Sequence, residues 1–256
     1  MKMNLMHGDC LELMKQIPDG SVDAIICDPP YGTTACKWDS VIPFDPMWEQ
    51  LKRIIKPNGA ICLFGSEPFS SHLRLSNLKW FKYDWVWKKN TAIGAMTAKF
   101  MPMKNHEIIS VFSKNKCAYF PQKTKRKESE LKKLSKSSKL KNKYESTHPD
   151  KGRVQKRENM LFKNPFSVLT FNAVFGRSKE KVAHPTQKPV ALLEYLIKTY
   201  TLEGETVLDF TMGSGSTGIA CLNTARNFIG IEKDDKYFQI AKDRIEGHEV
   251  QRSLFD

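Results

Sequence analysis

A short polar motif, Asp28-Pro29-Pro30-Tyr31, follows an apolar run from Val22 to Cys27 that is typical of a buried strand. An aromatic amine is a poor nucleophile because its lone pair is delocalised into the ring, so it needs acceptors for its N–H protons before it can attack. The Asp28 carboxylate can accept a hydrogen bond from one N–H and the Pro29 carbonyl a hydrogen bond from the other. The prolines stiffen the turn, and Tyr31 offers a face on which an aromatic ring can stack. We therefore expect Asp28, Pro29, Pro30 and Tyr31 to be catalytic; alone, they could also form a strand-to-loop turn with a buried tyrosine.

A second motif, a glycine-rich turn, lies between the strand-like residues 205–208 and the helix-like residues 216–223. Gly213 and Gly215 let the backbone approach a ligand, and the N-terminus of the following helix presents free N–H groups to a carboxylate. Glu232 ends the next strand, about 20 residues further on, where an acid can accept hydrogen bonds from both hydroxyls of a ribose. This order predicts a ligand that contains a nucleoside; for the glycines alone, a tight turn is the alternative.

Strand and helix patterns alternate along both ends of the chain, and these elements must position the two motifs. The alternation predicts an α/β fold with a doubly wound, mostly parallel sheet covered by helices on both faces. In such a sheet, residues that follow different strands can meet at the carboxyl edge. The expected strands are 4–6, 22–27, 60–64, 83–87, 107–112, 205–208 and 227–231, and the expected helices are 10–17, 45–55, a stretch ending at 78, 189–200, 216–223 and 234–245.

The net charge of +13 is concentrated in one segment of the chain. From Ser113 to Lys163 there are 17 Lys or Arg against 5 Asp or Glu, so this stretch carries +12 and the flanking parts are close to neutral. Few apolar residues interrupt it, which is typical of a partly flexible loop. It is either a solvated, low-complexity linker or a segment that follows phosphates along a nucleic acid.

The order of the motifs resembles that of the beta-class amino-group DNA methyltransferases, the N6-adenine and N4-cytosine family of the DPPY type, in which DPPY precedes the glycine motif. The resemblance covers residues 1–112 and 182–246. It implies a Rossmann-like methyltransferase domain with a catalytic half at 1–112, a basic, partly flexible target-recognition insertion at 113–181, and a cofactor-binding half at 182–256. It further implies S-adenosyl-L-methionine as the methyl donor, S-adenosyl-L-homocysteine as the product, no metal, and double-stranded DNA as the partner.

The resemblance also assigns candidate cofactor residues. The stretch from His184 to Pro189 (HPTQKP) resembles the family motif that contacts the methionine part of the cofactor, with a capped helix start as the alternative, and Gly8-Asp9-Cys10 resembles the element that contacts its adenine. The chain departs from the family where Asp-Pro-Phe is common, because it reads Asp-Phe-Thr at 209–211 and lacks the proline. The candidates are Asp9, Cys10, Asp28, His184, Thr186, Lys188, Asp209, Phe210, Gly213, Ser214, Gly215, Ser216, Thr217 and Glu232.

We expect the insertion to recognise the DNA target. Phosphate contacts position a protein on DNA, whereas contacts to base edges specify the sequence. The lysines of the insertion are therefore expected to set the affinity and its salt dependence. The candidate DNA-binding residues are Lys125, Arg126, Lys127, Arg153, Arg157 and Arg177.

The expected reaction is direct transfer of a methyl group to the N6 amine of an adenine flipped out of the duplex. Enzymes that act on carbon 5 of cytosine use a Pro-Cys nucleophile, and no cysteine here follows a proline. Adenine is favoured because the cytosine-amine members of the resembled family more often carry serine in place of Asp28; N4-cytosine transfer is the alternative. RNA and protein-glutamine methyltransferases usually place the glycine motif first, and a non-catalytic nucleic-acid-binding module would explain the basic segment but neither motif.

The bulk composition, with 40% hydrophobic and 11% aromatic residues, is that of a globular protein. No apolar run approaches the roughly 20 residues of a membrane span, and the first residues lack the apolar core of a signal peptide. The cysteines, at positions 10, 27, 36, 62, 117 and 221, are scattered without metal-ligand spacing and are expected to be reduced. We expect a cytoplasmic, nucleoid-associated protein of bacterial or phage origin, of the restriction-modification type, as a monomer or homodimer.

Overall fold

The computed structural model divides the chain into two compact units, Met1–Phe120 with Ser167–Asp256, and Pro121–Phe166. The described residues are 1–33, 39–131, 161–175, 180–182 and 187–253.

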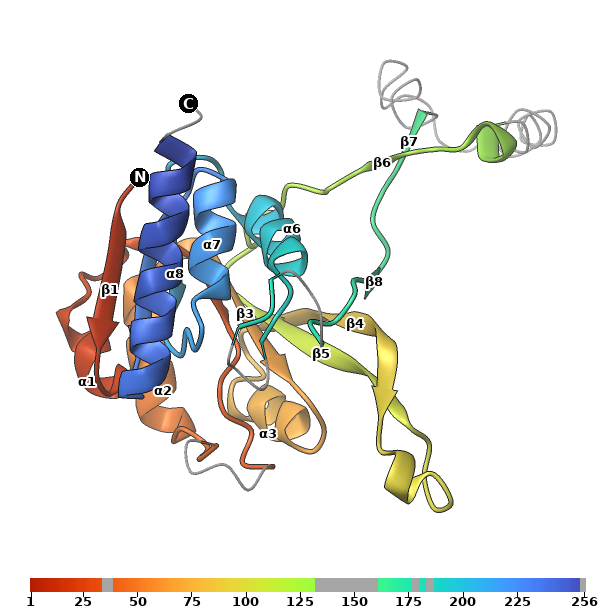
Figure 1. The fold of residues 1–256 in the computed structure, drawn as a ribbon, viewed down its shortest axis with the longest axis horizontal. Helices are drawn as coiled ribbons and strands as arrows, with labels where there is room; N and C mark the ends of the chain where they lie inside the picture. Colours follow the sequence, from red (N-terminus) through yellow and green to blue (C-terminus); the bar gives the residue numbers. More distant parts are fainter. Residues whose placement is uncertain (34–38, 132–160, 176–179, 183–186, 254–256) are drawn as a thin grey trace. The chain divides into compact units, whose positions relative to one another are not determined.

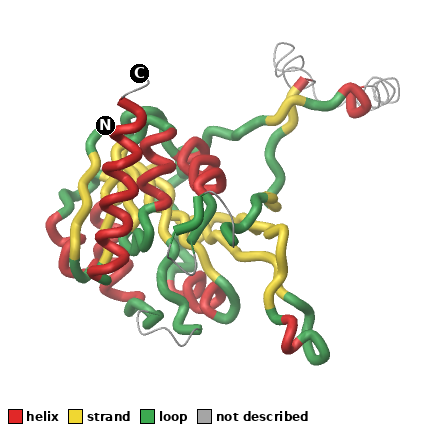
Figure 2. The backbone as a smooth tube through the Cα atoms, in the orientation of Figure 1, coloured by secondary structure: helices red, strands yellow, loops and turns green. Residues whose placement is uncertain are grey.

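One eight-stranded sheet forms the centre of the larger unit (Figures 1 and 2). In spatial order its strands are β1 (Met3–His7), β10 (Asn227–Glu232), β9 (Thr206–Asp209), β2 (Val22–Cys27), β3 (Ile55–Gly65), β5 (Lys104–Phe112), β4 (Phe81–Ile93) and β8 (Val168–Thr170). The first five run parallel to one another. β5 runs antiparallel to both β3 and β4, so β4 points in the same direction as β3, and β8 is parallel to β4.

Helices cover both faces of the sheet, and β2 shows how the sequence produces this arrangement. All six residues of β2 are buried. Because successive side chains of a strand point to opposite faces, Ala24 and Ile26 belong to one apolar cluster, and Ile25 and Cys27 to the other. The first cluster includes residues of α6 (Val190–Tyr200), α7 (Ser216–Asn223) and α8 (Asp235–Ser253); the second includes α2 (Phe44–Ile54) and α3 (Phe69–Ser76) and contacts α1 (Cys10–Leu13).

The predicted α/β class with a large, mostly parallel sheet is confirmed. The differences are the strand β8, which was not predicted, and several element boundaries. The predicted helix 10–17 is α1 followed by a 3₁₀ turn at Met14–Gln16. β3 begins at Ile55 rather than at the predicted residue 60, because Val22 pairs with Ile55 while Ala24 pairs with Ala60. The four residues between Ile55 and Ala60 belong to β3 and lie opposite the single residue between Val22 and Ala24, so the ladder has an irregularity of the bulge type here.

The smaller unit contains a short antiparallel pair, β6 (Thr124–Lys125) and β7 (Phe162–Lys163). The Arg126 N–H extends the pairing by donating to the Leu161 carbonyl, at 2.8 Å. This unit lies within the expected insertion 113–181, but β8 from the same expected segment pairs with β4 in the main sheet. In neither unit does a described helix have the length and apolar character needed to cross a membrane.

Candidate active site

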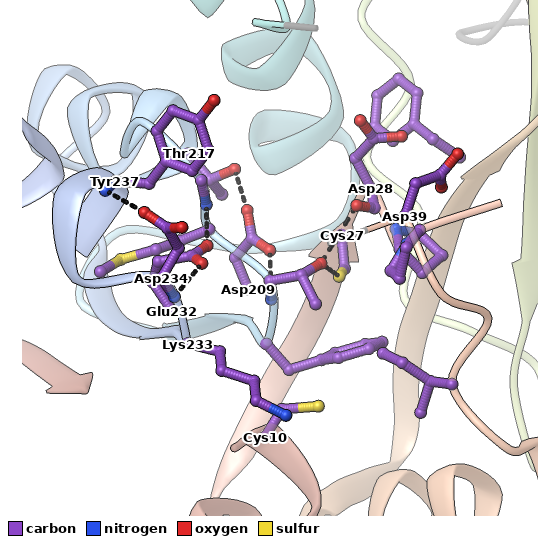
Figure 3. A pocket seen from close by; sticks show the side chains of 18 of the residues that line it. Cys10, Cys27, Asp28, Asp39, Asp209, Thr217, Glu232, Lys233, Asp234 and Tyr237 are labelled. Atoms are coloured by element: carbon purple, nitrogen blue, oxygen red, sulfur yellow. Dashed lines mark hydrogen bonds between the residues drawn. The ribbon is translucent and has the colours of Figure 1, made fainter. Parts of the chain in front are cut away.

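Four acidic side chains from distant parts of the sequence meet at the carboxyl edge of the sheet. Asp9 and Asp28 follow β1 and β2, and Asp209 and Glu232 end β9 and β10. All four line one cavity of about 630 Å³, a volume typical of small-molecule sites. In Figure 3, Asp209 lies between Glu232 and Asp28, as the strand order β10–β9–β2 requires. The motifs at the two ends of the sequence therefore share one cavity.

The Asp28 carboxylate is held by two partners. The Tyr31 hydroxyl donates to Oδ1, and the Lys188 ammonium group donates to Oδ2. The Tyr31 ring is packed against Phe69, with the ring centroids 5.0 Å apart. Lys188 is 9% exposed and comes from the segment just before α6, so its charge is presented to Asp28 inside the protein. The expected catalytic motif is thus connected to the expected cofactor motif by an ion pair.

A chain of alternating charges continues from Asp28 into β5 and β4. The Lys188 ammonium lies 3.3 Å from Glu107 Oε2, and Glu107 forms a second ion pair with Lys89. Glu107 also lines the cavity. A buried charge without a partner is strongly destabilising. In the row of side chains Asp28, Lys188, Glu107 and Lys89, each charge is compensated by a neighbour of opposite sign.

This arrangement sets the direction of three pKa shifts. Burial raises the pKa of Asp28 above its ordinary value, and Lys188 offsets this only in part. Burial would also raise the pKa of Glu107, but Lys188 and Lys89 hold it below its ordinary value. Burial opposes the charged form of Lys188, but Asp28 and Glu107 outweigh it and raise the Lys188 pKa. Lys188 therefore remains a cation, and it favours the ionised form of Asp28.

Asp209 holds the glycine turn together from inside. Its Oδ1 accepts the Thr211 N–H at 3.2 Å, and its Oδ2 accepts the Thr217 hydroxyl at 2.6 Å. The latter bond is drawn in Figure 3. Burial raises the pKa of Asp209 to about 6. Both oxygens are thus engaged in fixing the start of α7 against the end of β9.

Glu232 binds the same turn from the other side. Its Oε2 accepts the Gly213 N–H at 2.8 Å, and its Oε1 accepts the Asp234 N–H at 2.8 Å. Burial raises the pKa of Glu232. A carboxylate offers about four lone-pair sites in all, so two backbone bonds leave acceptor capacity on the side that faces the cavity.

Asp9 and Cys10 lie beside Glu232, because the end of β1 pairs with the end of β10. Asp9 caps α1 by accepting the Leu11 N–H at 2.9 Å, and its other oxygen lies 3.1 Å from Lys233 Nζ. Burial acts to raise the pKa of Asp9, but Lys233 and the Leu11 N–H bring it below its ordinary value. Burial raises the pKa of the Cys10 thiol to about 11, so this side chain is neutral at physiological pH.

Thr211 connects the glycine turn to the DPPY motif. Its hydroxyl donates to the Asp28 backbone carbonyl at 3.1 Å and lies 2.9 Å from Cys27 Sγ. Thr211 stands where the resembled family commonly has phenylalanine. In this chain the side chain at this position forms a polar contact between the segments that follow β9 and β2.

The remaining residues of the glycine motif have different surroundings. Phe210 is 1% exposed, within an apolar cluster, and also borders the cavity. Gly215 has a φ of 77°, and a Cβ at this position would lie 3.0 Å from Ala241 Cβ in α8. The structural reason for Gly215 is thus the close approach of α8. The other predicted cofactor residues of this motif that line the cavity are Gly213, Ser214, Ser216 and Thr217.

Several predicted site residues cannot be placed in the cavity. His184 and Thr186, predicted to contact the cofactor, lie outside the described residues. The same holds for Arg153, Arg157 and Arg177 among the DNA-binding candidates. The other DNA-binding candidates, Lys125, Arg126 and Lys127, belong to the smaller unit.

Sequence reasoning missed three side chains that shape this site. Asp39 accepts the N–H groups of Tyr31 and Gly32 at 2.7 and 2.9 Å and so fixes the loop after DPPY. The sequence pattern indicates Glu107 only as part of a core strand, and it does not distinguish Lys89 from other lysines. For Glu107 the available signal was its position directly before the mostly apolar residues 108–112.

The cysteines and acidic residues of the site form neither a metal centre nor a disulfide within the described part of the chain. Among the described residues, no group of at least three His, Cys, Asp or Glu is arranged to hold a metal ion. The described cysteines, Cys10, Cys27, Cys62, Cys117 and Cys221, are free thiols.

The chain is similar to known DNA methyltransferases in sequence and in fold. The profile of the DNA methylase family of N6 and N4 enzymes matches residues 22–243. The type II methyltransferase M.HpaI of Haemophilus parainfluenzae is 29% identical over 96% of this chain and 75% of its own length.

Solved structures show the same relationship. The structure of M1.HpyAVI with SAM has a TM-score of 0.58 and 26% identity, covering 94% of this chain and 99% of the other. The PvuII DNA methyltransferase, described as cytosine-N4-specific, has a TM-score of 0.65 over 95% of this chain and 86% of the other, but at 16% identity it supports the fold alone. The family match covers most of the sequence, and its two motifs share one cavity. This chain therefore belongs to the DNA methylase family of S-adenosylmethionine-dependent enzymes that methylate exocyclic amines of DNA bases.

Proposed function

We propose that this DNA amino-methyltransferase acts on the N6 amine of an adenine flipped out of double-stranded DNA. The observation that carries the proposal is the position of Asp28, whose carboxylate lies in the same cavity as Glu232 and the glycine turn. A flipped base beside Asp28 would thus be next to the methyl donor. Aspartate rather than serine at the first position of DPPY favours adenine over cytosine.

The cavity fits S-adenosylmethionine by its volume and by the chemistry of its walls. Glu232 keeps acceptor capacity for ribose hydroxyls, and the backbone at Gly213 can be approached closely because it carries no side chain. Asp9 and Cys10 would contact the adenine of the cofactor, and Lys188 borders the end nearest Asp28. When bound, the cofactor supplies a methyl group on a sulfonium, which is a strong electrophile.

The residues of this chain would then provide alignment and proton acceptors. Asp28 Oδ1 and Oδ2 are held by Tyr31 and Lys188, so the carboxylate cannot rotate away from the incoming amine. It accepts one amine N–H, and the Pro29 carbonyl accepts the other, which directs the nitrogen lone pair toward the methyl group. A fixed acceptor of this kind contributes through positioning and electrostatics, with no reorganisation during the reaction.

Methylation-sensitive sequencing of DNA from cells that express the chain tests this proposal, because it reports target base, sequence context and activity together. Nucleoside mass spectrometry of the same DNA is the independent measurement. N6-methyladenine is expected. N4-methylcytosine as the only product would overturn the choice of adenine but leave the family assignment intact.

The basic segment around β6 is proposed to hold the DNA backbone. Lys125 and Lys127 are exposed and Arg126 is half-buried, and together with Arg153, Arg157 and Arg177 they form the proposed DNA-binding set. Their role follows from charge, since each cation that neutralises a phosphate releases bound counterions.

A further inference from the structure

The β4–β5 hairpin carries an apolar tip for which the proposed chemistry has no use. Residues 90–103 are all exposed, and nine of these 14 residues are Ala, Ile, Met, Phe or Pro. Met96 is 98% exposed and Phe100 is 86% exposed. Soluble proteins rarely present contiguous large apolar side chains to water unless they contact another molecule. Figure 1 shows the hairpin, in yellow, extending beyond the body of the sheet.

Hydrogen bonds within the tip give it a defined conformation. The chain turns at Gly94, which has a φ of 94°, and forms a 3₁₀ turn at Ala95–Thr97. The Thr97 carbonyl accepts the N–H groups of Phe100 and Met101 at 2.9 and 3.1 Å. The apolar side chains are therefore presented on an ordered turn, which limits the conformational entropy lost when they contact a partner.

The hairpin begins at the edge of the sheet where the cavity opens. β4 points in the same direction as β2 and β3, so its end lies on the same edge as Asp28. Glu107, which lines the cavity, pairs with Trp87 in β4, and the strand continues from there to Ile93. At about 3.3 Å per residue, this extends the tip by up to roughly 20 Å beyond the level of Glu107, more than the depth of roughly 8 Å of a DNA groove.

The charge of the hairpin identifies the kind of molecule that it contacts. No Asp or Glu occurs from Trp85 to His106, and this stretch contains Lys88 and Lys99, both exposed. Two copies of a positive surface would repel each other, whereas a duplex supplies phosphates for the lysines and stacked bases for the apolar side chains. Proteins that kink or unstack DNA insert Phe, Met, Leu, Ile or Pro between base steps in this way.

We infer that the β4–β5 hairpin is a wedge that enters the DNA beside the target base and fills the stack with Phe100 and Met96 when that base leaves it. This role deepens the proposed function and rests on it. A base must be unpaired and unstacked before it reaches Asp28, and the wedge would stabilise the duplex in that opened form. The lysines would hold the neighbouring phosphates.

Methyl transfer on two duplexes tests the wedge. One duplex carries the sequence identified by methylation sequencing, and the other carries the same sequence with the target base mispaired, so that it is already partly unstacked. For the double variant Met96→Ala with Phe100→Ala we expect kcat/KM to fall on the paired duplex by at least about tenfold, and to recover on the mispaired one. Met96→Leu with Phe100→Leu retains an apolar wedge and should restore most of the activity.

Two further measurements separate this inference from its alternatives. Leu202→Ala, at an exposed position that precedes β9 and so lies toward the other edge of the sheet, is the matched control and should act equally on both duplexes. Unwinding of a closed circular plasmid reports insertion without methyl transfer: wild type is expected to unwind it and the double alanine variant is not. Wild type that unwinds the plasmid but methylates no base would contradict the proposed function and retain the wedge.

The wedge is overturned if the double alanine variant methylates and unwinds like wild type, or if its loss of activity is equal on paired and mispaired duplexes. A change in sedimentation from dimer to monomer in the alanine variant, with unwinding unaltered, would instead identify the tip as a contact between copies of this chain.

Discussion

At the scale of single residues, the position of Lys188 decides how Asp28 can act. Lys188 lies 160 positions further along the chain, yet its ammonium group donates to the Asp28 carboxylate. Without a cation nearby, burial would favour the protonated acid, which is a poor acceptor for an amine proton. The ion pair therefore provides a carboxylate that is both desolvated and ionised.

The pH dependence of methyl transfer checks the role of Lys188. The acceptor form of Asp28 is the ionised one, so activity is lost as the pH falls through the Asp28 pKa, which burial raises. Lys188→Met removes the charge that opposes this rise, and we expect the acidic limb of the kcat profile to move to higher pH. On that limb, each pH unit of displacement lowers the ionised fraction about tenfold.

Two variants make this measurement specific to the charge. Lys188→Arg keeps a cation and should return the limb toward its wild-type position. Lys89→Met removes the partner of Glu107 on the far side from Asp28, and should move the limb less. If Lys188→Met lowered kcat at all pH values without displacing the limb, Lys188 would act through packing or cofactor contact only.

Replacement of Asp28 tests its role as a hydrogen-bond acceptor for the amine. We expect Asp28→Ala to abolish methyl transfer, with a loss of at least about 100-fold in kcat, because the amine then has one acceptor instead of two. Cofactor binding should be nearly unchanged, since Glu232, Gly213 and Asp9 remain. Isothermal titration with S-adenosylmethionine measures the binding. Retained transfer would mean that another residue is the acceptor.

At the scale of elements, the glycine turn lies between the cavity on one side and α8 on the other. Its inner side faces the cavity at Gly213, and its outer side faces α8 at Gly215. Asp209 and Thr217 hold the turn between them through a hydrogen bond of 2.6 Å. The turn is therefore shaped by helix packing as much as by the ligand.

A pair of glycine variants separates backbone strain from packing. Gly204 and Gly215 have φ values of 80° and 77°, but a Cβ at Gly204 meets nothing within 4 Å. Gly204→Ala should lower the free energy of unfolding by about 1–2 kcal/mol through the left-handed backbone alone. Gly215→Ala should lower it by a further roughly 1–3 kcal/mol, because the added methyl group overlaps α8.

Chemical denaturation followed by circular dichroism measures both glycine variants under the same conditions. Equal losses of stability for the two variants would show that α8 can shift to accept the methyl group without cost.

At the scale of the whole molecule, the basic segment around β6 and the catalytic cavity belong to different units. The cavity and the ion pairs that link Asp28 to Lys89 lie in the larger unit, and the β6–β7 pair, with the exposed Lys125, lies in the smaller one. Electrostatic affinity for DNA and the geometry of transfer can therefore be changed separately.

Salt-dependent DNA binding checks the role of the basic segment. We expect replacement of Lys123, Lys125, Arg126 and Lys127 by glutamine to flatten the plot of log K against log salt, by about 0.9 for each phosphate that is no longer neutralised. kcat at saturating DNA should change little. Lys198→Gln with Lys242→Gln, on helices of the larger unit, is the control and should leave the slope unaltered. An unchanged slope in the quadruple variant would mean that these side chains do not contact phosphates and that the segment is a solvated linker.

Those parts of the protein that depend on neighbours along the chain could be inferred from the amino-acid order alone. The run from Val22 to Cys27 is apolar at nearly every residue, which predicts a strand buried on both faces, and all six residues are buried. The DPPY and glycine motifs each follow such a strand, and this local rule, together with their order, predicted the α/β sheet and the family. For the same reason the predicted boundaries failed where pairing overrode local signals, as at Ile55.

Which side chains meet is a property of the folded chain. The bond from Thr211 to the Asp28 carbonyl joins residues 183 positions apart. The pairing of Lys188 with Glu107 depends on how α6 packs against the sheet and on the pairing of β5 with β3. The residues of the hairpin tip likewise have an ordinary apolar composition, and only the structure shows that their side chains are exposed on strands that extend past the sheet. Strand register and helix packing set these distances, and neither is encoded in the spacing of residues within one segment.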